Sequence, residues 1–228
     1  RKLVHNFDYY IQHYDYLANE FSKYYSIERS KVFTIRSGTF DHFKVFAEVT
    51  PEYGNYFLFF GRISAYKGLV YLVKGFEEYC KDNEDLHLVI AGAGDVSDIL
   101  DIVKKEPKIH LINRRLSINE MNGLINNCLF TVCTYTDATH SAVIVVSYAF
   151  EKPVLAHNVG GISEVIIDGE TGILLQDLRS QTIKEGIIKI KELIQTDKYQ
   201  KGISYLRNQG IMSWRLIAKQ YEKIYNSI

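Results

Sequence analysis

The 228-residue sequence predicts an α/β fold, a doubly wound parallel sheet, over most of its length. Short apolar runs recur from residue 56 onward, each four to six residues long and apolar on successive positions, as in strands covered on both faces. Segments with apolar residues three and four apart separate these runs, as in amphipathic helices. Strands and helices in alternation imply a parallel sheet with right-handed crossovers.

Six runs are predicted to be the strands of this sheet: Tyr56–Phe60, His87–Ala91, Ile109–Ile112, Leu129–Thr134, Pro153–Ala156 and Gly172–Leu175.

Helices are predicted between and after the strands, and one begins at the capping box formed by Ser117 and Glu120. Asp95 follows a glycine turn and is predicted to cap another helix, and Glu164 is predicted to lie in the first turn of a further one. The other predicted helices are Leu69–Cys80, Ser141–Phe150, Ser180–Gln195, Asp197–Asn208 and Ser213–Ser227.

Residues 1–50 follow a different pattern. Asp8–His13 and Lys31–Ile35 read as strands and Tyr16–Tyr25 as a helix, too few elements to form a core of their own. We therefore expect the tail of another domain whose beginning is absent. The best linker candidate is Phe43–Asn55, which contains a proline and a glycine and lacks a sustained apolar period.

Composition excludes several classes of protein. Twenty-seven basic and 27 acidic residues leave a net charge of zero, so no global field attracts nucleic acid or acidic membranes. Three cysteines, Cys80, Cys128 and Cys133, match no metal-binding spacing and are expected to be reduced thiols. No apolar stretch approaches the roughly 18 residues needed to cross a bilayer.

Ligands of open parallel sheets bind beyond the carboxyl ends of the strands. The first such loop, Gly61–Gly68, carries Arg62 and Lys67 and leads into a helix, where an anion is favoured. The alternative is a solvated loop with two incidental cations, and spacing alone does not separate the two interpretations.

Later strand-end loops add further candidates. The Arg114–Arg115 pair, ahead of Leu116, lies where backbone groups could contact a nucleobase, or is simply surface charge. The loop Thr134–Ala142 ends at a helix start, where its hydroxyls and free amides could cradle phosphate oxygens; His140 within it could donate to a phosphate or be structural.

Gly160 and Gly161 follow the fifth strand and permit a close approach of the backbone to a ligand, or a tight connection. Taken together, the cations, glycines and helix starts favour a phosphate-bearing ligand, most simply a nucleotide.

Several segments, in order, resemble one known family. Phe59–Gly68 is similar to its motif F-x-G-R-x-x-x-x-K-G. The similarity continues through Leu88–Gly94, Glu151–Val154, Asn158–Glu164, Asp168–Leu175, Ser213–Trp214 and Ile217–Tyr221. Together they resemble the group 1, or family 4, retaining glycosyltransferases of the GT-B fold, across nearly all of residues 55–228.

The resemblance implies a Rossmann-like, nucleotide-sugar-binding carboxy-terminal domain in residues 51–228. Residues 1–50 would be the tail of an otherwise missing amino-terminal domain, plus the hinge. The implied reaction moves a sugar from a nucleotide-diphosphate-sugar donor to an acceptor hydroxyl with retention, in bacterial polysaccharide biosynthesis, and the chain alone is expected to be inactive.

By family position, Arg62 and Lys67 would hold the donor diphosphate as the catalytic cations, beside Gly61. Arg115 and Leu116 would contact the base. The remaining implied donor contacts are Thr139, His140, Ser141, Ala142, Val143, Gly160, Gly161 and Glu164.

One departure concerns two glutamates that the family usually carries eight residues apart. Ala138 and Val146 occupy those positions, and neither side chain accepts a hydrogen bond. Two alternatives therefore remain, a non-catalytic nucleotide-sugar-binding module and a GT-B-fold nucleotide-sugar epimerase.

The resemblance implies no cofactor and no metal. The expected partners are the nucleotide-sugar donor and a saccharide or lipid-linked saccharide acceptor, and no nucleic acid. It implies a cytoplasmic location, and leaves open a peripheral association with the inner face of the membrane through the missing domain.

Overall fold

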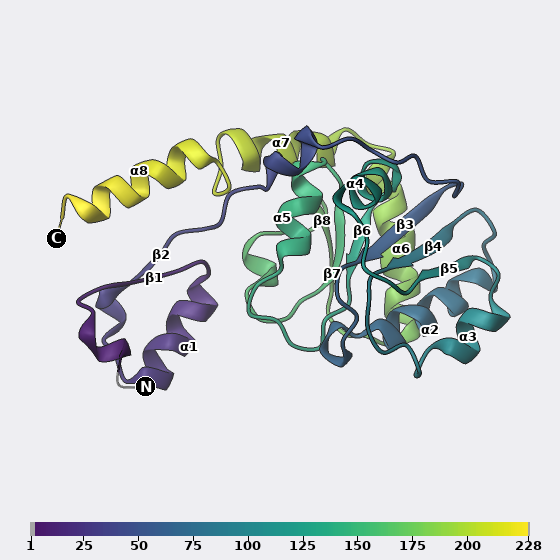
Figure 1. Cartoon of the computed structure of the whole chain (residues 1–228), viewed down its shortest axis with the longest axis horizontal. Coiled ribbons are helices and arrows are strands. Elements are labelled where there is room, and N and C mark those ends of the chain that lie inside the picture. The colour runs from purple at the N-terminus through teal and green to yellow at the C-terminus, as the bar shows by residue number, and fades with distance from the viewer. Residues whose placement is uncertain (1–2, 228) are drawn as a thin grey trace.

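The computed structural model describes residues 3–227, which form two lobes (Figure 1). The smaller lobe pairs two parallel strands, β1 (Tyr10–Gln12) and β2 (Val32–Thr34), and connects them through α1 (Asp15–Tyr25). These are the three elements predicted for residues 1–50. We call this part, up to residue 36, the amino-terminal lobe.

The larger lobe is built on a six-stranded parallel sheet in the order β5-β4-β3-β6-β7-β8. This order is that of a doubly wound, Rossmann-like fold, so the predicted fold class is confirmed. The strands are β3 (Tyr56–Phe60), β4 (His87–Ala91), β5 (Ile109–Ile112), β6 (Thr131–Cys133), β7 (Val154–His157) and β8 (Gly172–Leu175).

Helices cover both faces of the sheet because alternate side chains of each strand enter two separate apolar clusters. Phe57 and Phe59 of β3 belong to one cluster, whereas Tyr56, Leu58 and Phe60 belong to the other. The first cluster lies under α2 (Leu69–Cys80), α3 (Leu100–Lys105) and α6 (Ser180–Ile194). The second lies under α4 (Ile118–Asn127), α5 (Ala142–Ala149) and α7 (Lys198–Asn208).

One local prediction is wrong. Asp95 does not cap a helix: its Oδ1 accepts a hydrogen bond from the Ser97 amide in a turn, and α3 begins only at Leu100. Glu164 lies in the first turn of a helix, as predicted, but this helix is only the single 3₁₀ turn Ile162–Glu164. Asp95 thus forms an Asx turn, a local alternative to the N-cap, whereas the Glu164 carboxylate is bound by the distant amides of Asp15 and Tyr16.

The last helix, α8 (Trp214–Tyr225), runs back over the amino-terminal lobe (Figure 1). Ile217 and Ile224 pack there against Ile35 in a third apolar cluster. Trp214 Nε1 donates a hydrogen bond to the Thr39 carbonyl oxygen at 2.9 Å. The chain therefore connects its two lobes twice, through the linker and through α8.

Cys128 and Cys133 are buried, Cys80 is partly buried, and all three are free thiols, as predicted. Within residues 3–227, every helix is too short or too polar to cross a bilayer.

Candidate functional site

The sheet changes winding direction between β3 and β6, and the loops that follow these strands form the candidate site. The first loop, Gly61–Gly68, contains a single 3₁₀ turn, Ala65–Lys67. The Lys67 side chain folds back beneath the start of the loop, where a Cβ on Gly61 would lie 3.2 Å from Lys67 Nζ. Only 8% of Lys67 is exposed.

Lys67 is a nearly buried cation without a carboxylate partner in the described part of the chain. Its Nζ lies instead 5.2 Å from the centroid of the Tyr135 ring and 6.0 Å from that of Phe59. Burial lowers the pKa of Lys67; the Cys133 thiol opposes this shift, and the charge of Arg62 adds to it. A bound anion would offset both the cost of burying the Lys67 charge and the repulsion between Lys67 and Arg62.

Arg62 is exposed and close enough to influence the charge of Lys67. Like Lys67, it forms no ion pair with any carboxylate among residues 3–227. Two neighbouring cations that neutralise nothing inside the protein are suited to a ligand with more than one negative charge.

The loop after β6 is bound to this first loop. The Thr136 amide donates to the Tyr66 carbonyl at 2.7 Å, and Thr134 Oγ1 donates to the Lys67 and Gly68 carbonyls, each at 3.3 Å. Gly68 has φ +66°, and a Cβ there would overlap the Thr134 carbonyl oxygen. The two loops are therefore in direct contact.

Helix α5 begins beside these loops with its first amides available. Ser141 is the N-cap residue, but its hydroxyl accepts no hydrogen bond from the helix amides and instead donates to Tyr135 Oη at 3.4 Å. The amides of Ala142 and Val143 have no acceptor within residues 3–227. Free amides at a helix start attract anions, so these two amides are available to an anionic ligand, and their contact with a phosphate stays a prediction.

Cys133 lies under this helix start. Its Sγ is 3.8 Å from Ser141 Oγ, and burial raises the pKa of the thiol to about 11, so it remains protonated at neutral pH.

His140 faces the amino-terminal lobe. Its ring centroid lies 6.0 Å from that of His13 and 5.6 Å from that of Tyr14, edge to face. Burial lowers the pKa of His140, and the neighbouring His13 lowers it further. Thr139, next to it, is exposed at the rim, with its carbonyl oxygen close to Gly161.

Other parts of the chain occupy the space beside Gly160 and Gly161. Gly160 has φ +57°, and a Cβ there would overlap the Ala138 carbonyl oxygen. A Cβ on Gly161 would lie 2.7 Å from Cγ of Tyr14. The close approach that these glycines permit is therefore to neighbouring segments of the chain, and their contact with a donor stays a prediction.

Glu164 binds the amino-terminal lobe. Its carboxylate accepts hydrogen bonds from the first amides of α1, those of Asp15 at 2.9 Å and Tyr16 at 2.8 Å. Arg36 forms an ion pair with the same carboxylate at 2.6 Å. The Glu164 carboxylate thus binds groups of the protein itself, and its contact with a donor also stays a prediction.

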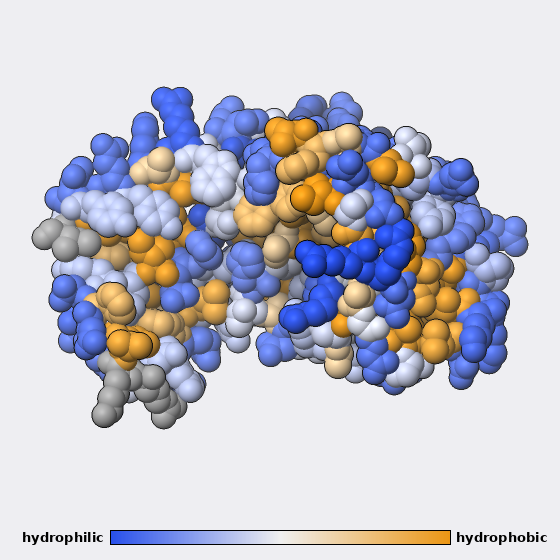
Figure 2. Space-filling view, viewed as in Figure 1, coloured by the Kyte–Doolittle hydropathy of each residue, from blue (hydrophilic) through white to orange (hydrophobic). Residues whose placement is uncertain are grey.

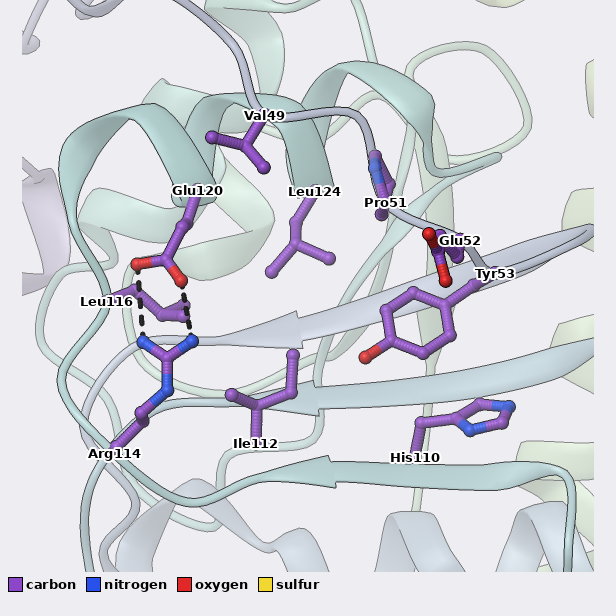
Figure 3. Close-up of a pocket in the computed structure, with 10 residues that line it drawn as sticks. All are labelled: Val49, Pro51, Glu52, Tyr53, His110, Ile112, Arg114, Leu116, Glu120 and Leu124. Carbon is purple, nitrogen blue, oxygen red and sulfur yellow. Dashed lines mark hydrogen bonds and ion pairs between the residues drawn. The ribbon is translucent and has the colours of Figure 1, made fainter.

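Arg115 is exposed after β5, whereas Arg114 forms an ion pair with Glu120, the capping-box residue of α4. Leu116 lines a cavity of about 430 Å³ between the linker, β5 and α4. Figure 3 shows Arg114 and Glu120 facing each other at one end of this cavity, and the rings of Tyr53 and His110 at the other.

Sequence reasoning missed this cavity and the central place of Tyr135. The cavity depends on the linker folding across α4, where the Val49 amide donates to the Asn119 carbonyl. No local sequence pattern predicts a contact between residues so far apart. Tyr135 could have been suspected from its position, two residues beyond a buried strand in a loop rich in hydroxyls.

The two positions where the family carries glutamates are both closed to solvent. Ala138 and Val146 are each 5% exposed and belong to the apolar cluster under α4 and α5. The apolar residues at these two positions therefore pack into the core of the larger lobe.

Comparison with known proteins gives a family match over most of the chain. The model of the glycosyl transferases, group 1, matches residues 41–208. An uncharacterized glycosyltransferase of Methanocaldococcus jannaschii is 27% identical over 179 residues, 76% of this chain and 48% of its own length. The Staphylococcus aureus capsular polysaccharide biosynthesis glycosyltransferase CapM is 24% identical over 176 residues, 73% of this chain and 44% of its own.

Solved structures show the same fold. HepE of Anabaena, crystallised with UDP, has a TM-score of 0.80 and 17% identity, over 97% of this chain and 64% of its own. The S. aureus protein TarM has a TM-score of 0.72 and 16% identity, over 97% of this chain and 44% of its own. The chain spans about half the length, or less, of the curated relatives it matches.

Proposed function

The chain belongs to the group 1 glycosyl transferases, and from this premise we propose that residues 51–228 bind the donor of a sugar-transfer reaction. The donor is a nucleoside-diphosphate sugar, and the acceptor is a hydroxyl of a saccharide or lipid-linked saccharide. One observation carries the proposal: Lys67 and Arg62 lack carboxylate partners within residues 3–227 and lie at the winding switch of the sheet, near the free start of α5.

The reaction needs stabilisation of the negative charge that grows on the departing diphosphate. Arg62 and Lys67 supply two cations, and the amides of Ala142 and Val143 supply dipoles. Such preorganised groups act without a proton transfer, and losing one typically costs about 10²–10³ in rate. The chain's own groups thus meet the need, and we propose a reaction that uses neither a metal nor a cofactor.

Arg115 and Leu116 follow β5, the strand at one edge of the sheet, and we propose that they contact the base of the bound nucleotide. The relatives fit a nucleotide donor: HepE structures were solved with UDP and with UDP-glucose. CapM and TarM provide the saccharide context, since CapM acts in capsular polysaccharide biosynthesis and TarM was crystallised with fondaparinux and α-GlcNAc-glycerol. A role in bacterial polysaccharide assembly, with retention at the anomeric carbon, completes the proposal.

The amino-terminal lobe is proposed to be the end of the acceptor-binding domain, with residues 37–50 as the hinge. The segment ahead of its first strand exposes apolar side chains, among them Leu3 at 76% and Phe7 at 63% exposure. Figure 2 shows hydrophobic side chains on the visible face of this lobe. Such exposure fits a lobe that packs against further parts of a larger domain.

A non-catalytic nucleotide-sugar-binding module is the second candidate. The observation that favours it is the burial of Ala138 and Val146, which leaves no carboxylate at either family position to contact the sugar or the ribose.

Both candidates are tested by assaying the complete protein against a panel of nucleoside-diphosphate sugars with saccharide acceptors. We expect release of the nucleoside diphosphate only when the acceptor is present, and a product whose anomeric configuration matches that of the donor. Tight donor binding without transfer to any acceptor would favour the module. Failure to bind any nucleoside diphosphate would contradict both candidates.

A further inference from the structure

Tyr135 occupies the junction between the two loops of the candidate site. It follows β6 by two residues and is 3% exposed. The face of its ring receives the Lys67 ammonium at 5.2 Å, and Tyr66 packs against it edge to face at 5.9 Å. The ring is therefore a wall of the pocket that holds the buried cation.

The polar groups of Tyr135 point to the other half of the site. Its hydroxyl accepts a hydrogen bond from Ser141 Oγ at 3.4 Å, and Ser141 is the residue at which α5 begins. Its carbonyl oxygen lies 2.7 Å from His157 Nδ1, at the end of β7. One side chain thus contacts both the lysine and the helix start that the proposed function assigns to the diphosphate.

The chemistry of the phenol limits what it can do. Burial raises the pKa of Tyr135 above its ordinary value, and the Cys133 thiol raises it further. The side chain is therefore a neutral phenol at neutral pH, and we assign it no proton transfer.

An aromatic face stabilises an ammonium without neutralising it. A carboxylate in the same place would cancel the charge of Lys67 and compete with an incoming anion. Phe59, the other nearby ring, belongs to the apolar cluster on the opposite face of the sheet, whereas Tyr135 belongs to the cluster that contains α5.

We propose that Tyr135 is the positioning residue of the anion site: it holds the Lys67 ammonium charged and fixes it relative to the start of α5, so that both reach one diphosphate. The inference rests on the proposed function, because it requires a diphosphate in that place. It assigns Tyr135 no contact with the substrate and no chemical step.

The test is a double-mutant cycle in the complete protein, with dissociation constants measured for a nucleoside diphosphate and for the matching nucleoside. We expect Tyr135→Leu to weaken diphosphate binding about 5- to 30-fold, because a desolvated cation–π contact is lost. Nucleoside binding should stay within about twofold. In a Lys67→Ala background, the same change should cost less than about threefold, because its effect passes through the lysine.

Tyr135→Phe keeps the ring and the packing, so it remains informative if the leucine variant does not fold. We expect a loss of only about two- to threefold in diphosphate binding, and no further loss when Ser141→Ala is added, because both changes break one hydrogen bond. Tyr56→Phe is the matched control: Tyr56 is equally buried, donates to the Leu124 carbonyl at 2.7 Å, and should leave diphosphate binding unchanged.

Equal losses for nucleoside and diphosphate, or losses that add fully to those of Lys67→Ala or Ser141→Ala, would show that Tyr135 is only a core residue. In that case the proposed function stands, provided that Lys67→Ala still weakens diphosphate binding. Absence of diphosphate binding by the unmodified protein would overturn both.

Discussion

The carboxylate of Glu164 lies 2.6 Å from the guanidinium of Arg36 and joins the turn after β7 to the amino-terminal lobe. The same carboxylate accepts the amides of Asp15 and Tyr16, so it also caps α1 from outside the lobe. An anion at a helix start interacts favourably with the helix dipole and satisfies amides that lack an intrahelical partner. This contact is the clearest candidate for what sets the position of the two lobes.

Glu164→Gln should loosen this joint. The amide keeps the size of the side chain but removes its charge, and we expect a loss of about 1–2 kcal/mol in the free energy of unfolding. Faster hydrogen exchange at the Asp15 and Tyr16 amides is the direct measurement. Glu170→Gln, at an exposed position, is the control, and exchange rates identical in the two variants would contradict the assignment.

Gly68→Ala should separate the two loops of the site. The new Cβ would meet the Thr134 carbonyl oxygen, and the residue would also sit at φ +66°. Gly169→Ala is a matched control, since its φ is +74° but nothing lies within 4 Å of the new Cβ. We expect the control to cost about 1 kcal/mol and Gly68→Ala at least twice that, measured by denaturant unfolding. Similar costs would show that the loops are not in tight contact.

Val146→Glu restores the family residue but should not restore a function. Val146 is 5% exposed within an apolar cluster, so the carboxyl would be buried without a partner. We expect a loss of about 2–4 kcal/mol in the free energy of unfolding and no gain in sugar transfer. Val146→Leu controls for size. A stable Val146→Glu variant with increased transfer would show that the position opens onto the donor.

Stability should fall as the pH is lowered from about 7 toward 5. Burial lowers the pKa of His110 and of His140, and a second imidazole, His87 or His13, faces each of them. The unfolded chain therefore binds protons at a higher pH than the folded chain, which favours unfolding on acidification. Urea unfolding at several pH values is the measurement.

The loss of stability between pH 7 and 5 should be smaller in His140→Asn than in a variant of the exposed His5, which is the control. A protein that becomes more stable between pH 7 and 5, or a His140→Asn variant with an unchanged pH dependence, would contradict the prediction.

The sequence predicted the sheet well because its strands are buried on both faces. Continuous apolar runs such as Tyr56–Phe60 and His87–Ala91 match β3 and β4 residue for residue. The bounds of β6 differ: it covers only Thr131–Cys133 of the predicted run, although Phe130 and Thr134 beside it are also buried. The capping box at Ser117 and Glu120 is present as predicted, because its contacts are local.

The candidate site was only partly predictable. Arg62 and Lys67 stand out because loops after parallel strands bind ligands. The partners that make Lys67 unusual, Tyr135 and Phe59, reach it only through folding. The binding of Glu164 to α1 joins residues almost 150 positions apart, and no periodicity or short motif encodes such a contact.

The central claim is that Arg62 and Lys67 receive a diphosphate, and calorimetric binding of a nucleoside diphosphate and of its nucleoside tests it most directly. We expect Lys67→Ala and Arg62→Ala each to weaken diphosphate binding about 10- to 100-fold and nucleoside binding less than about twofold. Lys74→Ala, an exposed lysine on α2, should change neither. Equal losses for the two ligands in the Lys67 and Arg62 variants would contradict the claim.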